Sequence, residues 1–337
     1  MRNFFALFLF LLSFGPLLHG QPISGSALSA NAFYERGTQL HDQEQLEEAI
    51  DFYSEAIRID QAHDKAIYNR GLAYYLQGKY NKALFDFDRV LQLAPNDQQA
   101  QEHRARLRFL LHDNDGAIAD YTRVVSKNPN CVLHVNRGIV HLEKKQFEEA
   151  LQDFETALTF DVNDQEAWNG KGDVYFAFAK YEEALHHYDQ ALALNPNDAR
   201  TLNNQANAFK QLKRPTLALE HYDQAIQVEA NTDIYVNRGF YALEQGNLPQ
   251  ALADCEEASR LDYRNNRAYY GIALTCIQLA RYERAIENLD KAIELHNEEA
   301  DYFFQRGLAA FQLTRLDEAH ADFTTALQMG MAATKVN

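Results

Sequence analysis

Histidines and paired glutamates are the residues of this sequence whose chemistry suits metal ligands or acid–base catalysts. The chain has 12 histidines, and His186-His187 is the only adjacent pair. Neighbouring residues on a helix point in different directions, so this pair is more typical of packed or solvated side chains than of a metal site. Three of the glutamate pairs stand where helices are expected to begin and where negative charge favours the helix dipole. These three are Glu47-Glu48, Glu148-Glu149 and Glu182-Glu183.

The sequence contains no motif of a known catalytic or cofactor-binding type. A Gly-rich phosphate loop, a nucleophile elbow and a zinc-binding His-Glu-x-x-His are all absent from it. We therefore expect no enzyme activity, no metal, no cofactor and no small-molecule substrate. The net charge of −16, without a basic stripe, also argues against nucleic acid and against docking on anionic membranes.

A short motif that returns about every 34 residues must position whatever function the chain has. Asn-Arg-Gly occurs at 69–71, 136–138 and 237–239, and a related Arg-Gly or Lys-Gly at 36–37, 171–172 and 306–307. Each of these glycines is followed twelve residues later by an alanine. A fixed period of this length is typical of a stacked array whose core lies between neighbouring repeats.

Alignment on this motif predicts nine helical hairpins over residues 30–333. Their first residues are 30, 64, 98, 131, 165, 199, 232, 266 and 300. In the most regular repeat, Gly172 and Tyr175 lie on one helix face, and Ala184 and Tyr188 lie on a second. The small residues allow two helices to approach closely, and Tyr188 fills the space beside them. The next repeat buries the outer face of each hairpin.

This pattern resembles the tetratricopeptide repeat. The repeat at 165–198 carries the family's marker residues at repeat positions 4, 8, 11, 20, 24, 27 and 32, which are Trp168, Gly172, Tyr175, Ala184, Tyr188, Ala191 and Pro196. It departs at position 7, where the family usually carries Leu and this chain has Lys171. The resemblance implies an all-α fold, a right-handed α-solenoid (superhelix) of nine hairpins. It also implies that positions 2, 5, 6, 9, 12 and 13 of the first helices project into a concave groove.

The spacing between repeats shortens from 34 to 33 residues before Cys131 and again before Thr232. A unit of three repeats therefore recurs over 30–130, 131–231 and 232–332. We interpret this as the triplication of a three-hairpin block, and drift within a uniform array is the alternative. The interpretation predicts that the local twist of the array changes near Cys131 and Thr232.

Residues 1–20 differ from the repeats and have the outline of a secretory signal peptide. Arg2 precedes an apolar run over residues 4–14, which Gly15-Pro16 ends. The run is shorter than the roughly 20 residues that span a bilayer, so cleavage is favoured and an uncleaved membrane anchor is the alternative. The expected order is signal peptide (1–20), linker (21–29), repeats (30–333) and tail (334–337), in a secreted or periplasmic protein.

The chain has three cysteines, Cys131, Cys255 and Cys276, whose spacing fits no metal site. We expect them to be buried small hydrophobes. A bridge between Cys255 and Cys276 is the alternative.

Four asparagines share repeat position 6 and are our candidates for holding a peptide backbone: Asn69, Asn136, Asn204 and Asn237. An amide carries a donor and an acceptor on one side chain, so it can hold a peptide group at both ends. The resemblance supplies a precedent, since an asparagine ladder binds extended peptide in the superhelix of the O-linked N-acetylglucosamine transferase. The alternative is that asparagine is simply common at this repeat position.

Aromatic side chains at groove positions are further candidates for peptide binding: Tyr68, Tyr75, Phe240, Tyr270 and Phe304. The alternative is that they pack between adjacent first helices. The fifth and sixth repeats are polar on the same face, with Asn169, Asp173, Arg200, Asn203, Asn207 and Lys210.

From these residues we predict a non-catalytic scaffold that binds a protein or peptide ligand in the groove of an exported assembly. The Lys and Asn set with which cochaperones of this family grip acidic tails is absent. A holdase-like chaperone for unfolded clients and a substrate-presenting subunit of an enzyme complex remain open alternatives. A homodimer through the last hairpin, where Leu316, Phe323 and Leu327 lie near an uncovered end, is a further hypothesis.

Overall fold

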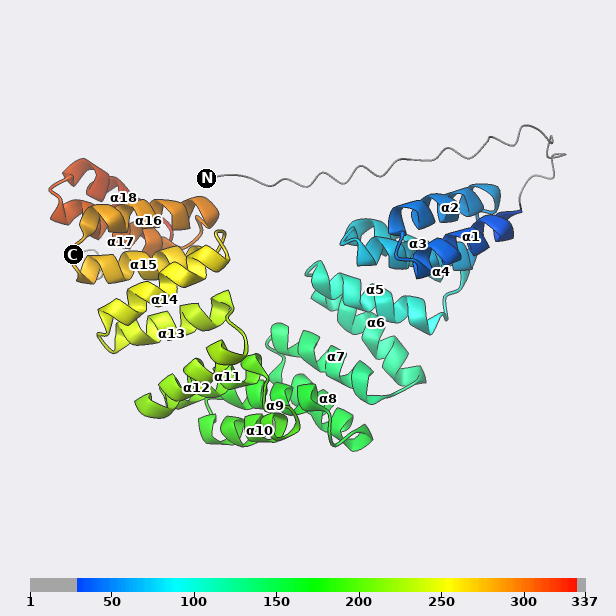
Figure 1. Ribbon diagram of the computed structural model, residues 1–337, viewed down its shortest axis with the longest axis horizontal. Coiled ribbons are helices and arrows are strands. Elements are labelled where there is room, and N and C mark those ends of the chain that lie inside the picture. The colour runs from blue at the N-terminus through cyan, green and yellow to red at the C-terminus, as the bar shows by residue number, and fades with distance from the viewer. Residues whose placement is uncertain (1–28, 332–337) are drawn as a thin grey trace, which may run out of the picture. The chain divides into compact units, whose positions relative to one another are not determined.

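The computed structural model describes residues 29–331, and within them the chain forms eighteen α-helices and no strand (Figure 1). The helices are α1 (Ala30–Asp42), α2 (Leu46–Ile59), α3 (Asp64–Leu76), α4 (Tyr80–Leu93), α5 (Gln98–Leu110), α6 (Asn114–Lys127), α7 (Cys131–Glu143), α8 (Phe147–Phe160), α9 (Gln165–Ala177), α10 (Tyr181–Leu194), α11 (Ala199–Gln211), α12 (Pro215–Val228), α13 (Thr232–Glu244), α14 (Leu248–Leu261), α15 (Asn266–Gln278), α16 (Tyr282–Leu295), α17 (Ala300–Gln312) and α18 (Leu316–Gln328). This succession of helical hairpins confirms the predicted all-α repeat fold. The predicted signal peptide and the tail at 334–337 lie outside the described residues.

Side-chain caps determine where most first helices begin. The residue before the helix accepts a hydrogen bond from a backbone N–H three positions later, at 2.7–3.1 Å, in the six cases Asp97, Asn130, Asp164, Asp198, Asn231 and Asn265. Each cap satisfies one of the N–H groups that a helix start leaves without a partner. The last residue of one repeat therefore starts the next repeat.

The turn inside each hairpin contains one residue in the left-handed conformation, at repeat position 15. Its φ lies between 57° and 73° in every repeat, yet it is glycine only at Gly78 and Gly246. Ala179 and the β-branched Thr314 adopt the same conformation, which disfavours side chains with a Cβ. Closure of the hairpin therefore overrides local preference at this position.

A large side chain at repeat position 24 packs in most hairpins, and in the seventh hairpin Cys255 takes this place. Phe154 of α8 is fully buried and lies over Gly138 of its own repeat and Gly170 of the following one. A Cβ added at Gly138 or Gly170 would lie 2.9 or 2.4 Å from the Phe154 ring, too close for either position to hold a larger residue unchanged. The ring therefore closes its own hairpin and also stacks it on its neighbour.

Buried ion pairs form a second link inside the hairpins. In four repeats the arginine at position 7 makes two hydrogen bonds of 2.7–2.9 Å to the aspartate sixteen residues later. The pairs are Arg70–Asp86, Arg137–Asp153, Arg238–Asp254 and Arg306–Asp322. The four aspartates are between 0% and 6% exposed, so the bidentate guanidinium compensates a charge that water does not reach.

The same position also contacts the preceding repeat. Arg238 Nη1 donates to Asp223 Oδ1 of α12 at 2.5 Å. Two other polar residues at position 7 make the same kind of contact, because Lys171 pairs with Glu155 at 3.4 Å and Gln205 Nε2 donates to Asp189 at 2.6 Å. These side chains therefore link a first helix to the second helix of the preceding repeat, whereas the eighth repeat has the buried Ile272 at this position.

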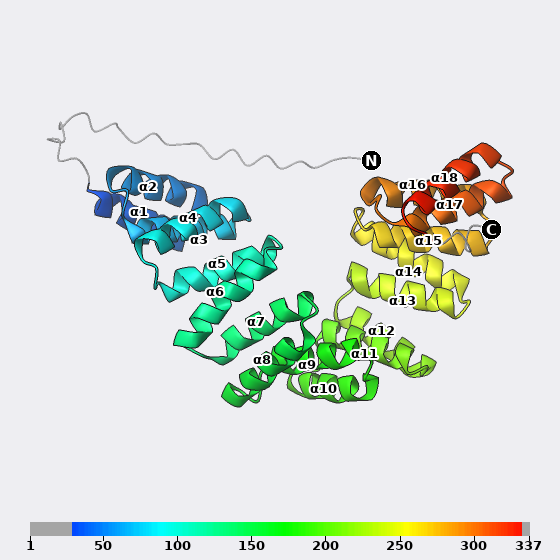
Figure 2. The ribbon, with the colours of Figure 1, turned by 180° about the vertical axis from the view of Figure 1, so that it is seen from behind.

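The chain divides into two compact units, one ending at Leu107 and the other beginning at Arg108. In the first unit α2 packs on both α1 and α3, and α3 also packs on α4 (Figure 2). In the second unit each helix from α6 to α18 packs on the next along the chain. The first helices α7, α9, α11, α13, α15 and α17 also form a continuous row of direct contacts.

Within the second unit, α12 and α13 pack more loosely than any other consecutive pair. They meet at one of the two shortened spacings, just before Thr232. The predicted change of local twist near Cys131 and Thr232 remains a prediction.

Two further findings concern the cysteines and the length of the apolar helices. All three cysteines are free thiols, so no bridge joins Cys255 and Cys276; these two are buried as expected, whereas Cys131 is only half-buried. No helix among residues 29–331 is both long enough and apolar enough to span a membrane.

Replacing Gly170 by alanine tests whether the Phe154 ring packs between two consecutive repeats. Gly170→Ala is expected to destabilise the protein by about 1–3 kcal/mol, because the new Cβ overlaps the Phe154 ring. The measurement is the urea midpoint of unfolding. In a Phe154→Leu background the same substitution should cost less, since the ring is gone. An equal cost in both backgrounds contradicts this packing.

Removing one partner of a buried pair tests the ionic link. Arg238→Met is expected to lower the stability by about 3 kcal/mol, because the carboxylate of Asp254 stays buried without a cation and keeps only the neutral Gln250 amide as a donor. Adding Asp254→Asn removes that charge and should recover a large part of the loss in thermal unfolding. If the double variant is no more stable than Arg238→Met, the carboxylate is not the cause.

Candidate functional site

We use the name first-helix face for the side chains at repeat positions 2, 5, 6, 9, 12 and 13 of the odd-numbered helices. In the second unit this face is continuous from α7 to α17, because these helices contact one another in order. It holds a cavity of about 270 Å³. The lining residues come from α7, α9, α10 and α11 and are Leu142, Asp173, Phe176, Tyr188, Asn204 and Asn207.

Asp173 lies at the centre of the hydrogen bonds around this cavity. Its Oδ1 accepts from the Tyr188 hydroxyl at 2.8 Å and from Asn204 Nδ2 at 2.9 Å. Its Oδ2 accepts from Arg200 Nη2 at 3.2 Å. Burial raises the pKa of the Asp173 carboxyl, and the nearby Arg200 guanidinium opposes this only in part. Burial likewise raises the pKa of Tyr188.

Two amides beside Asp173 keep hydrogen-bonding groups for a ligand. Asn207 Oδ1 accepts from the Tyr222 hydroxyl at 2.6 Å, and its Nδ2 has no partner among the described residues. Asn204 donates to Asp173, and no described group donates to its Oδ1. One free donor and one free acceptor, between the half-buried side chains of Leu142 and Phe176, match the needs of an extended peptide.

The first unit has its own cavity on the first-helix face, of about 340 Å³. Tyr34, Tyr68 and Asn69 line it together with the carboxylates Asp64 and Asp97. Burial raises the pKa of Tyr68 to about 12, and the Asp97 carboxylate adds to the effect. The structure thus brings the predicted site residues Tyr68 and Asn69 to one cavity.

Three of the four predicted asparagines use an amide N–H to join consecutive first helices. Asn69 donates to the Tyr34 hydroxyl at 3.5 Å, Asn204 to Asp173 at 2.9 Å and Asn237 to Asn203 Oδ1 at 3.1 Å. The Nδ2 atom of Asn136 is buried and makes no hydrogen bond within the described residues. Three of the four asparagines therefore serve contacts between repeats, and only the remaining groups of these amides are available to other partners.

The predicted aromatic residues take different places. Tyr270 lies between Phe240 and Tyr302, with ring centroids 6.1 and 4.7 Å away, so these rings fill the spaces between α13, α15 and α17. Its hydroxyl donates to Asp301. Phe304 is only 9% exposed and lies 5.8 Å from the Phe323 ring, which places it in the α17–α18 packing.

Tyr75, the last of the predicted aromatic residues, is half-buried on α3. Its ring centroid lies 5.9 Å from that of Tyr80 at the start of α4. This contact closes the end of the second hairpin, near the Gly78 turn. Unlike Tyr68, Tyr75 does not line the cavity of the first unit.

His186 and His187 do not form a ligand pair in α10. The His187 ring lies 5.7 Å from Trp168 and 4.8 Å from Tyr175, so it packs in the fifth hairpin. Burial lowers the pKa of His187 to about 4, with Lys171 and His186 adding to the effect, so the ring is neutral at physiological pH. Residues 29–331 contain no group of three or more His, Cys, Asp or Glu side chains placed to hold a metal ion.

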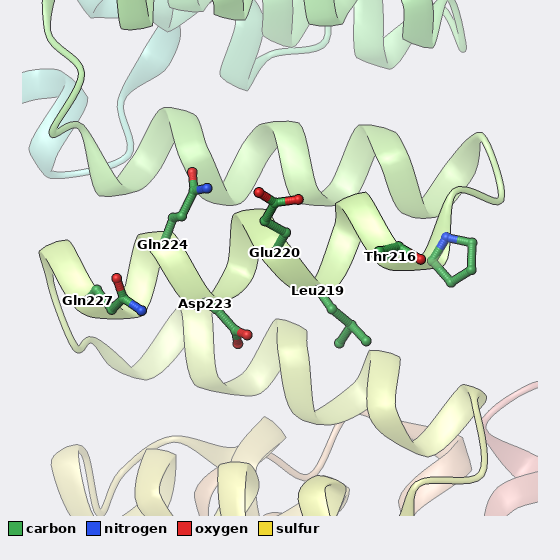
Figure 3. A pocket seen from close by; sticks show the side chains of 7 residues that line it. Thr216, Leu219, Glu220, Asp223, Gln224 and Gln227 are labelled. Atoms are coloured by element: carbon green, nitrogen blue, oxygen red, sulfur yellow. The ribbon is translucent and has the colours of Figure 1, made fainter.

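A second depression in the second unit lies on α12 alone and was not expected from the sequence. It measures about 630 Å³ and is lined by Pro215, Thr216, Leu219, Glu220, Asp223, Gln224 and Gln227. Figure 3 shows Leu219 and Asp223 pointing to one side of the helix and Glu220 and Gln224 to the other. Asp223 is already paired with Arg238, and the rest is an open polar helix surface. It offers less enclosure than the cavity around Asp173.

Sequence reasoning noted Asp173 and Asn207 only as polar members of the fifth and sixth repeats. Their partners Tyr188 and Tyr222 lie fifteen residues further along the chain, each on the second helix of the same hairpin. An acidic or amide residue at position 9 with tyrosine at position 24 is the signal that would have identified them.

Four models of the tetratricopeptide repeat match the chain. They cover residues 64–97, 30–78, 163–228, and the overlapping stretches 237–300 and 277–334. No curated protein matches the chain in sequence.

Several solved structures share its fold. A tetratricopeptide repeat protein from Parabacteroides merdae is 21% identical, with a TM-score of 0.66 over 73% of this chain and 98% of that one. A chain of the Cut9–Hcn1 hetero-tetramer of APC/C is 14% identical. Its TM-score is 0.62, and the match covers 91% of this chain and 75% of that one. Pseudomonas aeruginosa PilF is 20% identical, with a TM-score of 0.50 over 62% and 96%.

Tetratricopeptide repeats generally form non-catalytic scaffolds that bind protein partners. Repeat models match along most of the chain, and the hairpins have the fold of these structures. This chain therefore belongs to the tetratricopeptide repeat family.

Proposed function

We propose that the chain is a non-catalytic scaffold that holds an extended segment of a partner protein on the first-helix face of its second unit. The observation that carries this proposal is the cavity at Asp173, where free amide groups lie beside apolar side chains. Such a surface offers hydrogen bonds to a peptide backbone and contacts to its side chains. A catalytic role has no comparable support among the described residues.

The family comparisons support an assembly role. Cut9, a neighbour in fold, was solved as part of a hetero-tetramer with Hcn1, so repeats of this kind do bind other chains. We place the assembly of the present protein outside the cytoplasm because residues 1–20 have the outline of a signal peptide. An anchor formed by the same residues is the alternative, and both predict an exported repeat domain.

A holdase for unfolded clients is a second candidate. It is favoured by the exposed apolar side chains of the last hairpin, where Phe311, Leu316 and Leu327 are 53%, 60% and 40% exposed. The same surface is where we place the hypothetical homodimer. A holdase binds many unrelated chains, whereas a scaffold binds a defined partner.

Site-specific photo-crosslinking distinguishes these functions. We would place p-benzoylphenylalanine at Phe176, which lines the cavity, and at Leu219 on the α12 surface as the matched control (Figure 3). After irradiation in the source cells, the exported fraction should contain one discrete adduct for the Phe176 position and none for Leu219. Identical adducts at both positions contradict binding at the cavity, and a smear of many adducts favours the holdase.

A further inference from the structure

The Asp173 carboxylate carries negative charge that its surroundings do not fully compensate. Arg200 is the cation that binds it, but Arg200 Nη1 also donates to Glu166 at 3.0 Å. The two other groups that bind Asp173, Tyr188 and Asn204, are neutral. Two carboxyl groups therefore share one guanidinium, and the network has a net charge of about −1 when both are ionised. Burial raises the pKa of the Asp173 carboxyl, so a cation bound beside it would stabilise the ionised form.

This charge lies at low exposure, beside the cavity. The Asp173 side chain is 20% exposed, whereas those of Glu166 and Arg200 are about half exposed. Solvent therefore screens Asp173 less than its two charged neighbours. A carboxylate so placed attracts a cation more strongly than a fully solvated carboxylate does.

The walls of the cavity are apolar where they lead to Asp173. Leu142 of α7 and Phe176 of α9 line it together with the Tyr188 ring. An aliphatic stem can pack along these side chains while a charged group at its end reaches the carboxylate. The free Asn204 oxygen offers the same charged group a second acceptor, and the Phe176 ring offers a face for a cation–π contact.

We propose that this cavity takes a lysine side chain of the bound partner, with its ammonium group at Asp173 and its stem between Leu142 and Phe176. The inference rests on the proposed function and specifies the chemistry that the partner presents at this site. Lysine meets both requirements of the cavity, because it joins four methylene groups to a compact donor of three hydrogen bonds. The acidic character of the chain, with a net charge of −16, attracts such partners in general, and the cavity selects where the cation binds.

A pair of small probes tests this proposal on the full chain without altering the protein. Nα-acetyl-lysine N-methylamide is titrated against the protein and followed by saturation-transfer NMR, beside the norleucine compound that has the same stem without the charge. We expect the lysine compound to bind at least about tenfold more tightly, since a charge-assisted hydrogen bond is worth about 1.5–3 kcal/mol. Equal binding of the two compounds overturns the proposal.

Two variants of equal charge then locate the binding. Asp173→Asn should weaken the lysine compound about tenfold, whereas Asp223→Asn on α12, another carboxylate paired with one arginine, should leave binding unchanged. Thermal unfolding shows that both variants fold. Equal weakening by both means that overall charge, not the cavity, attracts the probe, and this result also overturns the proposal.

The lysine-site proposal and the scaffold proposal can fail independently of one another. If the Phe176 crosslink to a partner forms but the lysine compound binds no better than norleucine, the scaffold stands and the lysine site is wrong. If the probe binds as expected but no partner crosslinks at Phe176, the cation site stands and the scaffold proposal fails.

Discussion

The close approach of helices around the side chain at repeat position 24 is the contact on which this fold depends. Phe154 shows why, because one ring touches Gly138 of its own repeat and Gly170 of the next. The core of a hairpin and the interface between hairpins are therefore the same set of atoms. A single repeat cannot bury this ring alone, so the repeats are stable only as an array.

Polar contacts add a geometric constraint to this packing. Apolar contacts are non-directional, whereas a bidentate pair such as Arg238–Asp254 requires one relative position of its two helices. The third guanidinium nitrogen extends the link to Asp223 of the preceding repeat. A buried carboxylate is costly without its partner, so these pairs favour one register over alternatives.

The proposed binding surface consists of the groups that this packing leaves unpaired. Rings such as Tyr270 and Phe304 fill the spaces between helices, and three of the four asparagines at position 6 direct one N–H to the preceding first helix. The cavity at Asp173 is different, because its apolar walls and free amide groups remain open. We therefore place the proposed peptide site where the array is polar but incompletely paired.

The period, the hairpins and the small residues at position 8 follow from the sequence alone, because each depends on residues a few turns apart within one repeat. The sequence also assigned Tyr68, Asn69 and the polar residues of the fifth and sixth repeats to the first-helix face of their own repeats. It did not reveal that Ala179 and Thr314 adopt left-handed turns, or that Phe304 is buried. Nor did it show that Asp173 gathers groups from α9, α10 and α11. Tertiary structure decided these features, because packing between repeats determines which donor meets which acceptor and which groups remain for a ligand.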